Sequence, residues 1–353
     1  MRVTASCEFP FLEKWKEICE TNKLCEYMDS VLSGYAQITF SDNTFSGIVI
    51  LLATLIGSPV QAISAICATI AGTLTAYFMG VPKPLIRIGL YGFNSVLSGL
   101  IIPLLIFPGQ GVTLNMLIVS AIAGIMCTFS AAAIGSFLGK WNIAFLAAPY
   151  CVVIFILISA SILFGSVGSA PFEPAIATLA TEQAFTMTDF ASATLNGIAQ
   201  VLLIQKPICA ILYITALLLS SRIDAVNSVV GAIAGTFVAF AFGFPRDMVM
   251  SGLFGFNAIL LMHVMTRAFA PSVKSYLLAV LSAGFTSLVA VSVKVVLAPL
   301  GVPSFLAIPY VLVCVTIFLG RDMFGGLTYI PAIYWGVPET IYKALKENKI
   351  PKE

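Results

Sequence analysis

Long stretches of the chain carry almost no charged side chains. Examples are residues 45–57, 60–79, 88–107, 112–138 and 144–166. A helix needs about 20 apolar residues to cross the hydrocarbon core of a bilayer, so several of these runs are long enough on their own. The apolar length of the whole chain predicts about ten transmembrane helices, and therefore an all-α polytopic membrane protein.

Two segments that precede apolar runs are too short and too polar to span a membrane. Residues 31–41 contain Gln37, and residues 194–204 contain Gln200. Irregular backbone at membrane depth is tolerated only where it is buried in protein or lines a watery cavity. We therefore interpret these segments as two re-entrant half-helices.

The composition excludes several classes of protein. Of the 353 residues, 59% are hydrophobic and 10% are charged, whereas roughly a quarter are charged in soluble domains. The net charge of +2 gives no indication of a nucleic-acid partner. The first 20 residues lack the pattern of a cleaved secretory signal, and we expect a short helix outside the membrane there.

Five motifs occur twice along the chain at a nearly constant spacing. From Gln37 to Gln200 the spacing is 163 positions, and the same spacing relates GLYGFNSVL (89–97) to GLFGFNAIL (252–260). AGT and the Gly-x-Pro turn repeat in the same way, and FLAAPY (145–150) matches FLAIPY (305–310). A shared spacing over so many positions indicates a duplicated chain.

The distribution of charge indicates that the second copy is inverted. Cytoplasmic loops carry an excess of Lys and Arg. With an odd number of spans in each copy and a cytoplasmic N-terminus, most basic residues fall inside: Lys83, Arg87, Lys140, Arg222, Arg267, Lys274, Lys343, Lys346, Lys349 and Lys352. The main exception is Arg246. The central linker falls outside, where its charged residues are acidic: Glu173, Glu182 and Asp189.

The repeats and the charge pattern together divide the chain into five parts. They are a cytoplasmic N-terminal segment, a first inverted repeat, an extracytoplasmic linker, a second inverted repeat, and a C-terminal segment with a cytoplasmic tail: 1–29, 30–166, 167–192, 193–322 and 323–353. Both termini are expected in the cytosol. Inverted repeats with broken helices near the midplane are a recurrent design of transporters.

The repeated motifs supply the candidate groups for binding a solute. Gln37 and Gln200 add side-chain carbonyls beside half-helix ends, although each could instead tie a helix end to its neighbour. Phe93 and Phe256 offer flat walls for a planar solute, with glycines alongside that let backbones approach closely. The alternative for a phenylalanine in a span is a place in the core or against lipid.

Other repeated residues fit structural roles better. Asn94 and Asn257 are expected to satisfy backbone groups across a helix break. The prolines of FLAAPY and FLAIPY, Pro149 and Pro309, are expected near the start of a span, where they interrupt helical hydrogen bonding. Ala147 would then leave room at the centre of a pore, as would Ala307.

The sequence predicts neither a metal site nor an enzyme. None of the eight cysteines forms a CxxC pair, and His263 is the single histidine. A zinc site requires clustered Cys and His, and a disulfide framework is typical of small secreted domains. The apolar runs also lack the paired carboxylates or nucleophile with base that catalysis requires. We expect no cofactor.

Together, the Gln half-helices, the two GFN motifs and FLAAPY/FLAIPY resemble the urea transporter family over nearly all of residues 30–322. The resemblance implies ten spans with two half-helices, passive channel-like flux of urea, a homotrimer with one pore per subunit in membrane lipid, and a place in the bacterial inner membrane. The implied solute-binding residues are Gln37, Phe40, Phe93, Leu97, Ala147, Gln200, Leu203, Phe256, Leu260 and Ala307.

One departure from the family pattern leaves the solute open. The family places a threonine two residues before the proline, where this chain has Ala147 and Ala307. Loss of both hydroxyls could favour a short amide, ammonia or water over urea. An ion-coupled carrier is a second alternative, but intramembrane charges mark ion and proton paths, and the spans carry few of them beyond Lys294 and His263.

Overall fold

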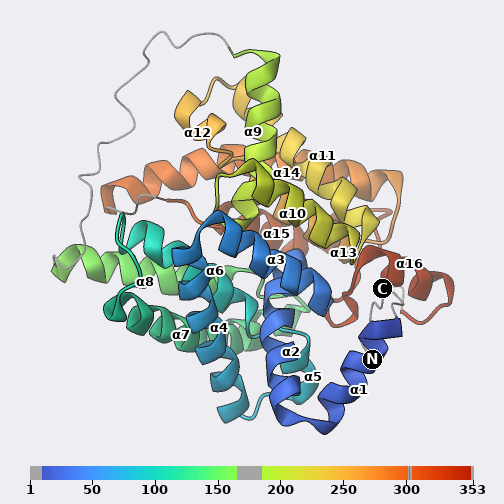
Figure 1. The fold of residues 1–353 in the computed structure, drawn as a ribbon. Coiled ribbons are helices and arrows are strands. Elements are labelled where there is room, and N and C mark those ends of the chain that lie inside the picture. The colour runs from blue at the N-terminus through green and yellow to red at the C-terminus, as the bar shows by residue number, and fades with distance from the viewer. Residues whose placement is uncertain (1–9, 165–184, 301, 303, 351–353) are drawn as a thin grey trace.

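In the computed structural model, which describes residues 10–164, 185–300, 302 and 304–350, the chain is helical (Figure 1). Within these ranges the sole β-type pairing is an isolated bridge between Phe269 and Tyr329. The first half contains α1 (Pro10–Thr21), α2 (Lys23–Ala36), the 3-10 helix η1 (Gln37–Thr39), α3 (Thr44–Gly57), α4 (Pro59–Phe78), α5 (Lys83–Arg87), α6 (Phe93–Leu105), α7 (Leu114–Leu138), η2 (Gly139–Trp141) and α8 (Ala148–Phe164).

The second half repeats this order of helices. It contains α9 (Met187–Ala199), η3 (Gln200–Leu202), α10 (Pro207–Leu218), α11 (Arg222–Ala241), α12 (Arg246–Met250), α13 (Gly255–Ala268), α14 (Val273–Leu297), η4 (Ala298–Leu300) and α15 (Ile308–Leu319). A C-terminal segment follows, with η5 (Arg321–Met323), η6 (Ala332–Tyr334) and α16 (Pro338–Lys346). The prediction of an all-α polytopic membrane protein is confirmed.

Helix length and apolarity identify the strongest membrane spans. Within the described residues, four helices pass on both criteria: Pro59–Phe78, Leu114–Trp141, Arg222–Ala241 and Val273–Leu297. Two bent pairs, Lys23–Thr39 with Thr44–Gly57 and Met187–Leu202 with Pro207–Leu218, bring the number to six if each counts as one span. Three shorter apolar helices accompany them, and the total of ten spans stays a prediction.

The bent pairs have the form expected of re-entrant segments. The chain bends by 79° in the first pair and 67° in the second. Each bend follows a residue in the left-handed conformation, Phe40 and Leu203, both with φ 56°. The incoming helices begin at Lys23 and Met187, earlier than the sequence predicted, because their first turns are polar and extend beyond the apolar runs.

The two half-helices approach the middle of the molecule from opposite sides. Figure 1 shows α2 below the centre of the view and α9 above it, both running towards the interior. The helices that follow them, α3 and α10, pack against each other. Figure 1 therefore places the ends of both half-helices in the region between the two halves.

Glycines bring the start of α6 and of α13 against the half-helices. Gly89 has φ 76°, and a Cβ atom there would collide with the backbone of Ser33 and Gly34 in α2. Gly252 has φ 79° and meets α9 in the same way. The expected close approach of backbones at the repeated glycines is confirmed here.

Two charged groups change the picture drawn from the sequence. Arg246, the exception in the charge pattern, pairs with Asp189 at 2.7 Å. Arg267, expected in a cytoplasmic loop, instead lies near the end of α13 with a fully buried side chain. Glu173 and Glu182 of the predicted linker lie outside the described residues.

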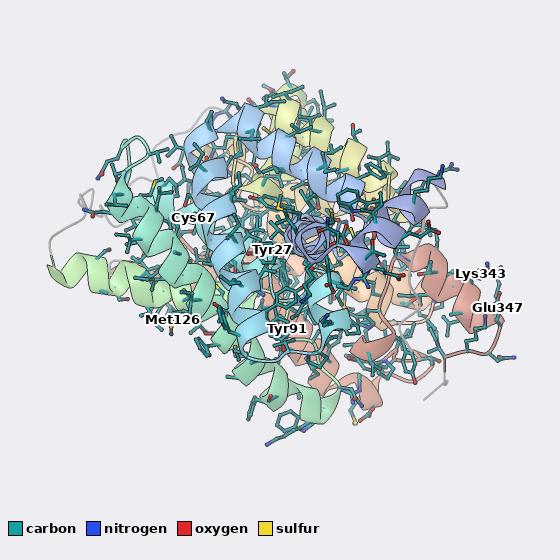
Figure 2. The ribbon with its side chains drawn as sticks, turned by 60° about the horizontal axis from the view of Figure 1, so that its bottom comes forward. Tyr27, Cys67, Tyr91, Met126, Lys343 and Glu347 are labelled. Carbon is teal, nitrogen blue, oxygen red and sulfur yellow. The ribbon has the colours of Figure 1, made fainter. Side chains whose placement is uncertain are left out.

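The C-terminal segment packs back onto the second half of the chain. The backbone N–H of Ile330 donates to the carbonyl of Ala268 at 2.7 Å. Glu339 of α16 accepts hydrogen bonds from the Ser221 hydroxyl at 2.7 Å and the Ile223 N–H at 3.1 Å, at the N-terminus of α11. Figure 2 shows Lys343 of α16 and Glu347, the residue that follows this helix, at the edge of the molecule.

We expect Gly89→Ala to destabilise the fold far more than Gly80→Ala. Both residues have positive φ, which costs an alanine about 1–2 kcal/mol, but a Cβ at Gly80 meets no atom within 4 Å. Gly89→Ala adds a collision with α2. Thermal unfolding of both variants in detergent checks this, and equal losses would show that the contact with α2 does not limit stability.

Candidate functional site: two cavities and the section between them

A first cavity of about 460 Å³ opens beside the end of the first half-helix. Gln37 and Phe40 line it, together with Phe93 at the start of α6. The rest of its wall is mostly apolar: Pro84, Leu85, Ile88, Leu90, Ala144, Phe145, Leu146, Arg267, Ala332, Ile333 and Trp335.

A second cavity of about 510 Å³ lies beside the end of the second half-helix. Gln200, Leu203 and Phe256 line it, and they are the counterparts of Gln37, Phe40 and Phe93. Its wall is more polar, with these further residues: Gly57, Gln61, Ile101, Leu104, Leu105, Tyr150, Ile204, Gln205, Lys206, Met248, Leu253, Lys294, Ser304, Phe305 and Leu306.

The predicted site residues are thus divided between two places. Phe93 and Phe256, predicted as flat walls for a planar solute, line different cavities. Each cavity contains one Gln, one residue at the left-handed bend and one GFN phenylalanine. The spacing in the sequence identifies corresponding residues, and corresponding residues in a duplicated chain occupy equivalent places, not the same place.

Each GFN phenylalanine has an aromatic partner that was not predicted from the sequence. Phe93 stacks on Phe145 with centroids 6.0 Å apart and planes 13° apart. Phe256 stacks on Phe305 with centroids 6.2 Å apart and planes 7° apart. These separations are those of rings in direct offset contact, so each pair forms a continuous aromatic wall. The repeated motifs FLAAPY and FLAIPY could have indicated these aromatic partners, because each motif begins with one of them, Phe145 or Phe305.

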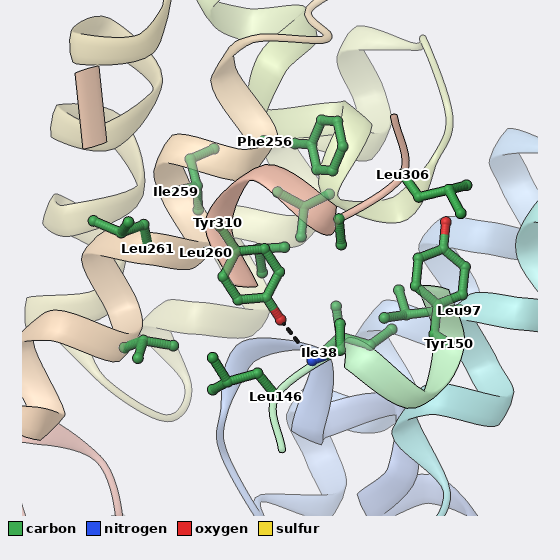
Figure 3. Close-up of a cluster of buried hydrophobic side chains, with 14 of the residues drawn as sticks. Ile38, Leu97, Leu146, Tyr150, Phe256, Ile259, Leu260, Leu261, Leu306 and Tyr310 are labelled. Carbon is green, nitrogen blue, oxygen red and sulfur yellow. Dashed lines mark hydrogen bonds between the residues drawn. The ribbon is translucent and has the colours of Figure 1, made fainter. Parts of the chain in front are cut away.

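Figure 3 shows a cluster of buried side chains that includes residues of both cavity walls, Leu146 of the first and Phe256 and Leu306 of the second. Leu97 and Leu260 lie in this buried cluster with Ala147 and Ala307, and line neither cavity wall described above. Figure 3 also places Ile38 in this cluster. We call this buried cluster, which reaches from the wall of the first cavity at Leu146 to the wall of the second at Leu306, the narrow section.

Asn94 and Asn257 hold the chain breaks that lead into α8 and α15. Asn94 Nδ2 donates to the carbonyl of Leu146 at 3.2 Å, and Asn94 Oδ1 accepts from the N–H of Tyr150 at 3.1 Å. Asn257 makes the equivalent bonds to Leu306 and Tyr310, both at 3.2 Å. The structural role expected for the two asparagines is confirmed.

The side chain of Gln200 is oriented by a backbone contact. Its Nε2 donates to the carbonyl of Ser251 at 3.0 Å. This bond engages one of the two amide N–H groups, and the side-chain oxygen has two acceptor sites. That oxygen is the group needed to receive an N–H donor from a solute.

Arg267 of α13 reaches across to the end of the first half-helix. Its guanidinium donates to the carbonyl of Thr39 at 3.3 Å and of Phe40 at 3.5 Å. Asp224 of α11 binds the same guanidinium at 2.9 and 2.6 Å, and both side chains are fully buried. The last carbonyls of a helix lack partners within the helix, so Arg267 acts as an external cap.

The second half-helix is capped by a neutral residue at the equivalent place. Gln61 of α4 donates to the carbonyl of Leu203 at 3.1 Å and to that of Leu100 at 2.8 Å. Gln61 and Leu104 are the counterparts of Asp224 and Arg267 at the repeat spacing. Neither cap was predicted from the sequence, because neither belongs to a motif that recurs with the same residues.

Residues beyond the second repeat complete the first cavity. Ala332, Ile333 and Trp335 of the C-terminal segment contribute to its wall. Trp335 is fixed there by a hydrogen bond from its indole N–H to the carbonyl of Ile330 at 2.8 Å. Within the described ranges, no three His, Cys, Asp or Glu side chains come together as a metal site.

Comparison with known proteins gives a consistent result. A family model described as "Urea transporter" matches residues 28–322. Two proteins named urea transporter 1, from Ovis aries and Capra hircus, are each 27% identical over 287 residues, which is 79% of this chain and 73% of theirs. The protein of that name from Rattus norvegicus is 27% identical over 274 residues, covering 74% of this chain and 69% of its own.

The Asp224–Arg267 pair gives a double-mutant test of the first cap. We expect Arg267→Leu to destabilise the protein by about 3–5 kcal/mol, because it leaves a buried carboxylate without its cation. Asp224→Gln with Arg267→Leu copies the residues of the first half, Gln61 and Leu104, and should recover most of that loss. Thermal unfolding in detergent measures the stability of the single and the double variant. A double variant as unstable as Arg267→Leu would contradict the role of Arg267 and Asp224 as a paired helix cap.

Proposed function

The chain belongs to the urea transporter family, and from that premise we propose that it conducts urea passively across a membrane along a path that joins the two cavities. Family membership supports transport of urea; the passive mechanism and the path between the repeats are the finer proposal. The observation that carries the proposal is the equivalent lining of the cavities, with Gln37 beside Phe93 in one and Gln200 beside Phe256 in the other.

The chemistry of these linings suits a small, flat and neutral solute. A polar group placed in an apolar site without a hydrogen bond costs about 1–3 kcal/mol by protein mutational data. In the proposed path, the N–H groups of urea meet the side-chain oxygen of each Gln and the carbonyls at the half-helix ends. The stacked phenylalanines contact its faces, and several weak sites in succession let the solute leave as easily as it enters.

The buried charges support a passive mechanism over coupling to an ion. Both carboxylate oxygens of Asp224 bind Arg267, and Arg267 also donates to carbonyls of His263, Thr39 and Phe40. The pair is therefore neutral as a unit and serves as a helix cap. Since intramembrane ionisable residues mark proton relays in many transporters, coupled transport is the second candidate function.

We propose the arrangement of the whole protein from the same premise. Residues 30–166 and 193–322 form two repeats of opposite orientation, joined by an extracytoplasmic linker at 167–192, with both termini in the cytosol. The protein resides in the bacterial inner membrane as a homotrimer with one path per subunit. The approach of α2 and α9 from opposite sides in Figure 1 supports the inverted orientation.

We expect purified protein in proteoliposomes to accelerate urea efflux well beyond that of empty vesicles, as measured by stopped-flow light scattering. An uncoupler should leave the rate unchanged, because no ion gradient drives the flux. Acetamide, ammonia and water measured in the same vesicles test the wider solute range suggested by Ala147 and Ala307. Urea flux equal to that of empty vesicles would refute the proposal, and collapse with the uncoupler would favour the coupled carrier.

We expect Gln37→Leu and Gln200→Leu each to lower urea flux about tenfold. Each substitution removes an acceptor, and an unmet polar group of about 1–3 kcal/mol raises the barrier by a factor of that order. Gln110→Leu serves as the matched control, since Gln110 is exposed in the loop between α6 and α7. Flux in Gln37→Leu equal to that of the control would remove Gln37 from the path.

A further inference from the structure

Two tyrosines cross between the halves in the narrow section that separates the cavities. Tyr150 is in the first turn of α8, and Tyr310 is its counterpart in the first turn of α15. Both are almost completely buried. The phenol group of Tyr310 reaches the other half of the chain, where its oxygen accepts a hydrogen bond from the backbone N–H of Ala147 at 2.9 Å (Figure 3).

The position of Tyr310 follows from the contacts that hold its backbone. Asn257 binds the N–H of Tyr310 and the carbonyl of Leu306, which fixes the first turn of α15. Leu146, next to Ala147, lines the first cavity, whereas Leu306 lines the second. The Tyr310 hydroxyl therefore lies on the boundary between the cavities.

Tyr150 holds the related position on the side of the second cavity. It is one of the residues that line that cavity. Figure 3 shows its hydroxyl directed towards Leu306, the neighbour of Ala307. Each phenol group thus extends from its own half to the section of backbone that contains the alanine of the other half.

A hydroxyl has one donor and two acceptor sites. Ala147 N–H occupies one acceptor site of Tyr310, so the hydroxyl proton is directed elsewhere. A solute that passed from one cavity to the other through this section would meet that donor. The complementary group on urea or a short amide is its carbonyl oxygen.

We propose that Tyr310 and Tyr150 supply the hydrogen-bonding hydroxyls of the narrow section, each across the repeat interface, and that they select solutes with a carbonyl oxygen. They take the place of side-chain hydroxyls at Ala147 and Ala307. This inference rests on the proposed function, and it assigns the selective step to two residues that line no part of the first cavity.

The test compares urea with thiourea in stopped-flow measurements on proteoliposomes. Thiourea carries the same N–H donors but offers sulfur, a weak acceptor, in place of oxygen. We expect Tyr310→Phe to lower urea flux about tenfold, equivalent to about 1.4 kcal/mol, and to lower thiourea flux much less. Tyr213→Phe is the matched control, because Tyr213 is a buried tyrosine of α10 that lines neither cavity.

A second variant separates a role for the hydroxyl from a role in packing. Ala147→Thr in the Tyr310→Phe background returns a hydroxyl to the same section, and should restore urea flux and the preference for urea over thiourea. Tyr150→Phe, which removes no bond to Ala147, should also lower the ratio of urea flux to thiourea flux. If Tyr310→Phe does not fold, the ratio of urea to thiourea flux in Tyr150→Phe tests the proposal instead.

The outcomes distinguish this inference from the function on which it rests. Wild-type protein that fails to pass urea would overturn the proposed function. Wild-type protein that passes urea, with the same ratio of urea to thiourea flux in Tyr310→Phe and Tyr150→Phe, would overturn the role of the tyrosines alone. An equal fall in both fluxes without rescue by Ala147→Thr would do the same.

Discussion

A helix that ends inside a membrane leaves carbonyl groups that water cannot satisfy, and the site is built around two such ends. Every polar backbone group at that depth needs a partner from the protein or from a solute. The chain turns sharply at Phe40 and Leu203, each in the left-handed conformation. The carbonyl of each of these residues then receives a donor from the other half of the chain, Arg267 for Phe40 and Gln61 for Leu203.

The two ends solve one problem with different chemistry. Gln61 is neutral and caps one carbonyl of the bend, whereas Arg267 brings a charge that Asp224 must balance in a buried place. A lone cation there would attract anions and repel cations, but the bound pair presents no net charge to the first cavity. The two halves have the same order of helices, and their side chains differ at the cap, where a donor is needed at each bend but its charge is not.

The repeat in the sequence predicted the fold better than it predicted the site. It identified the half-helices, the GFN residues and the chain breaks at Pro149 and Pro309, because each of these depends on local backbone geometry. It did not show that Phe93 and Phe256 line different cavities, since a constant spacing along the sequence does not give a distance in space. Arg267 was assigned to a loop because its partner Asp224 is remote in the sequence. Without a known partner, a charged side chain is expected to be exposed to water.

The order of polar groups along the proposed path matches the two ends of urea. In this proposal, Gln37, Gln200 and the half-helix carbonyls offer acceptors at the two cavities, and the hydroxyls of Tyr150 and Tyr310 stand between them. A solute with donors alone would meet no partner for those hydroxyl protons, and an ion would meet too few groups to replace its water. Because the middle is formed by side chains that cross from one half to the other, its width depends on how the halves pack. On the proposed path, discrimination therefore resides in the contact between the two halves, where the N–H of Ala147 donates to the Tyr310 hydroxyl.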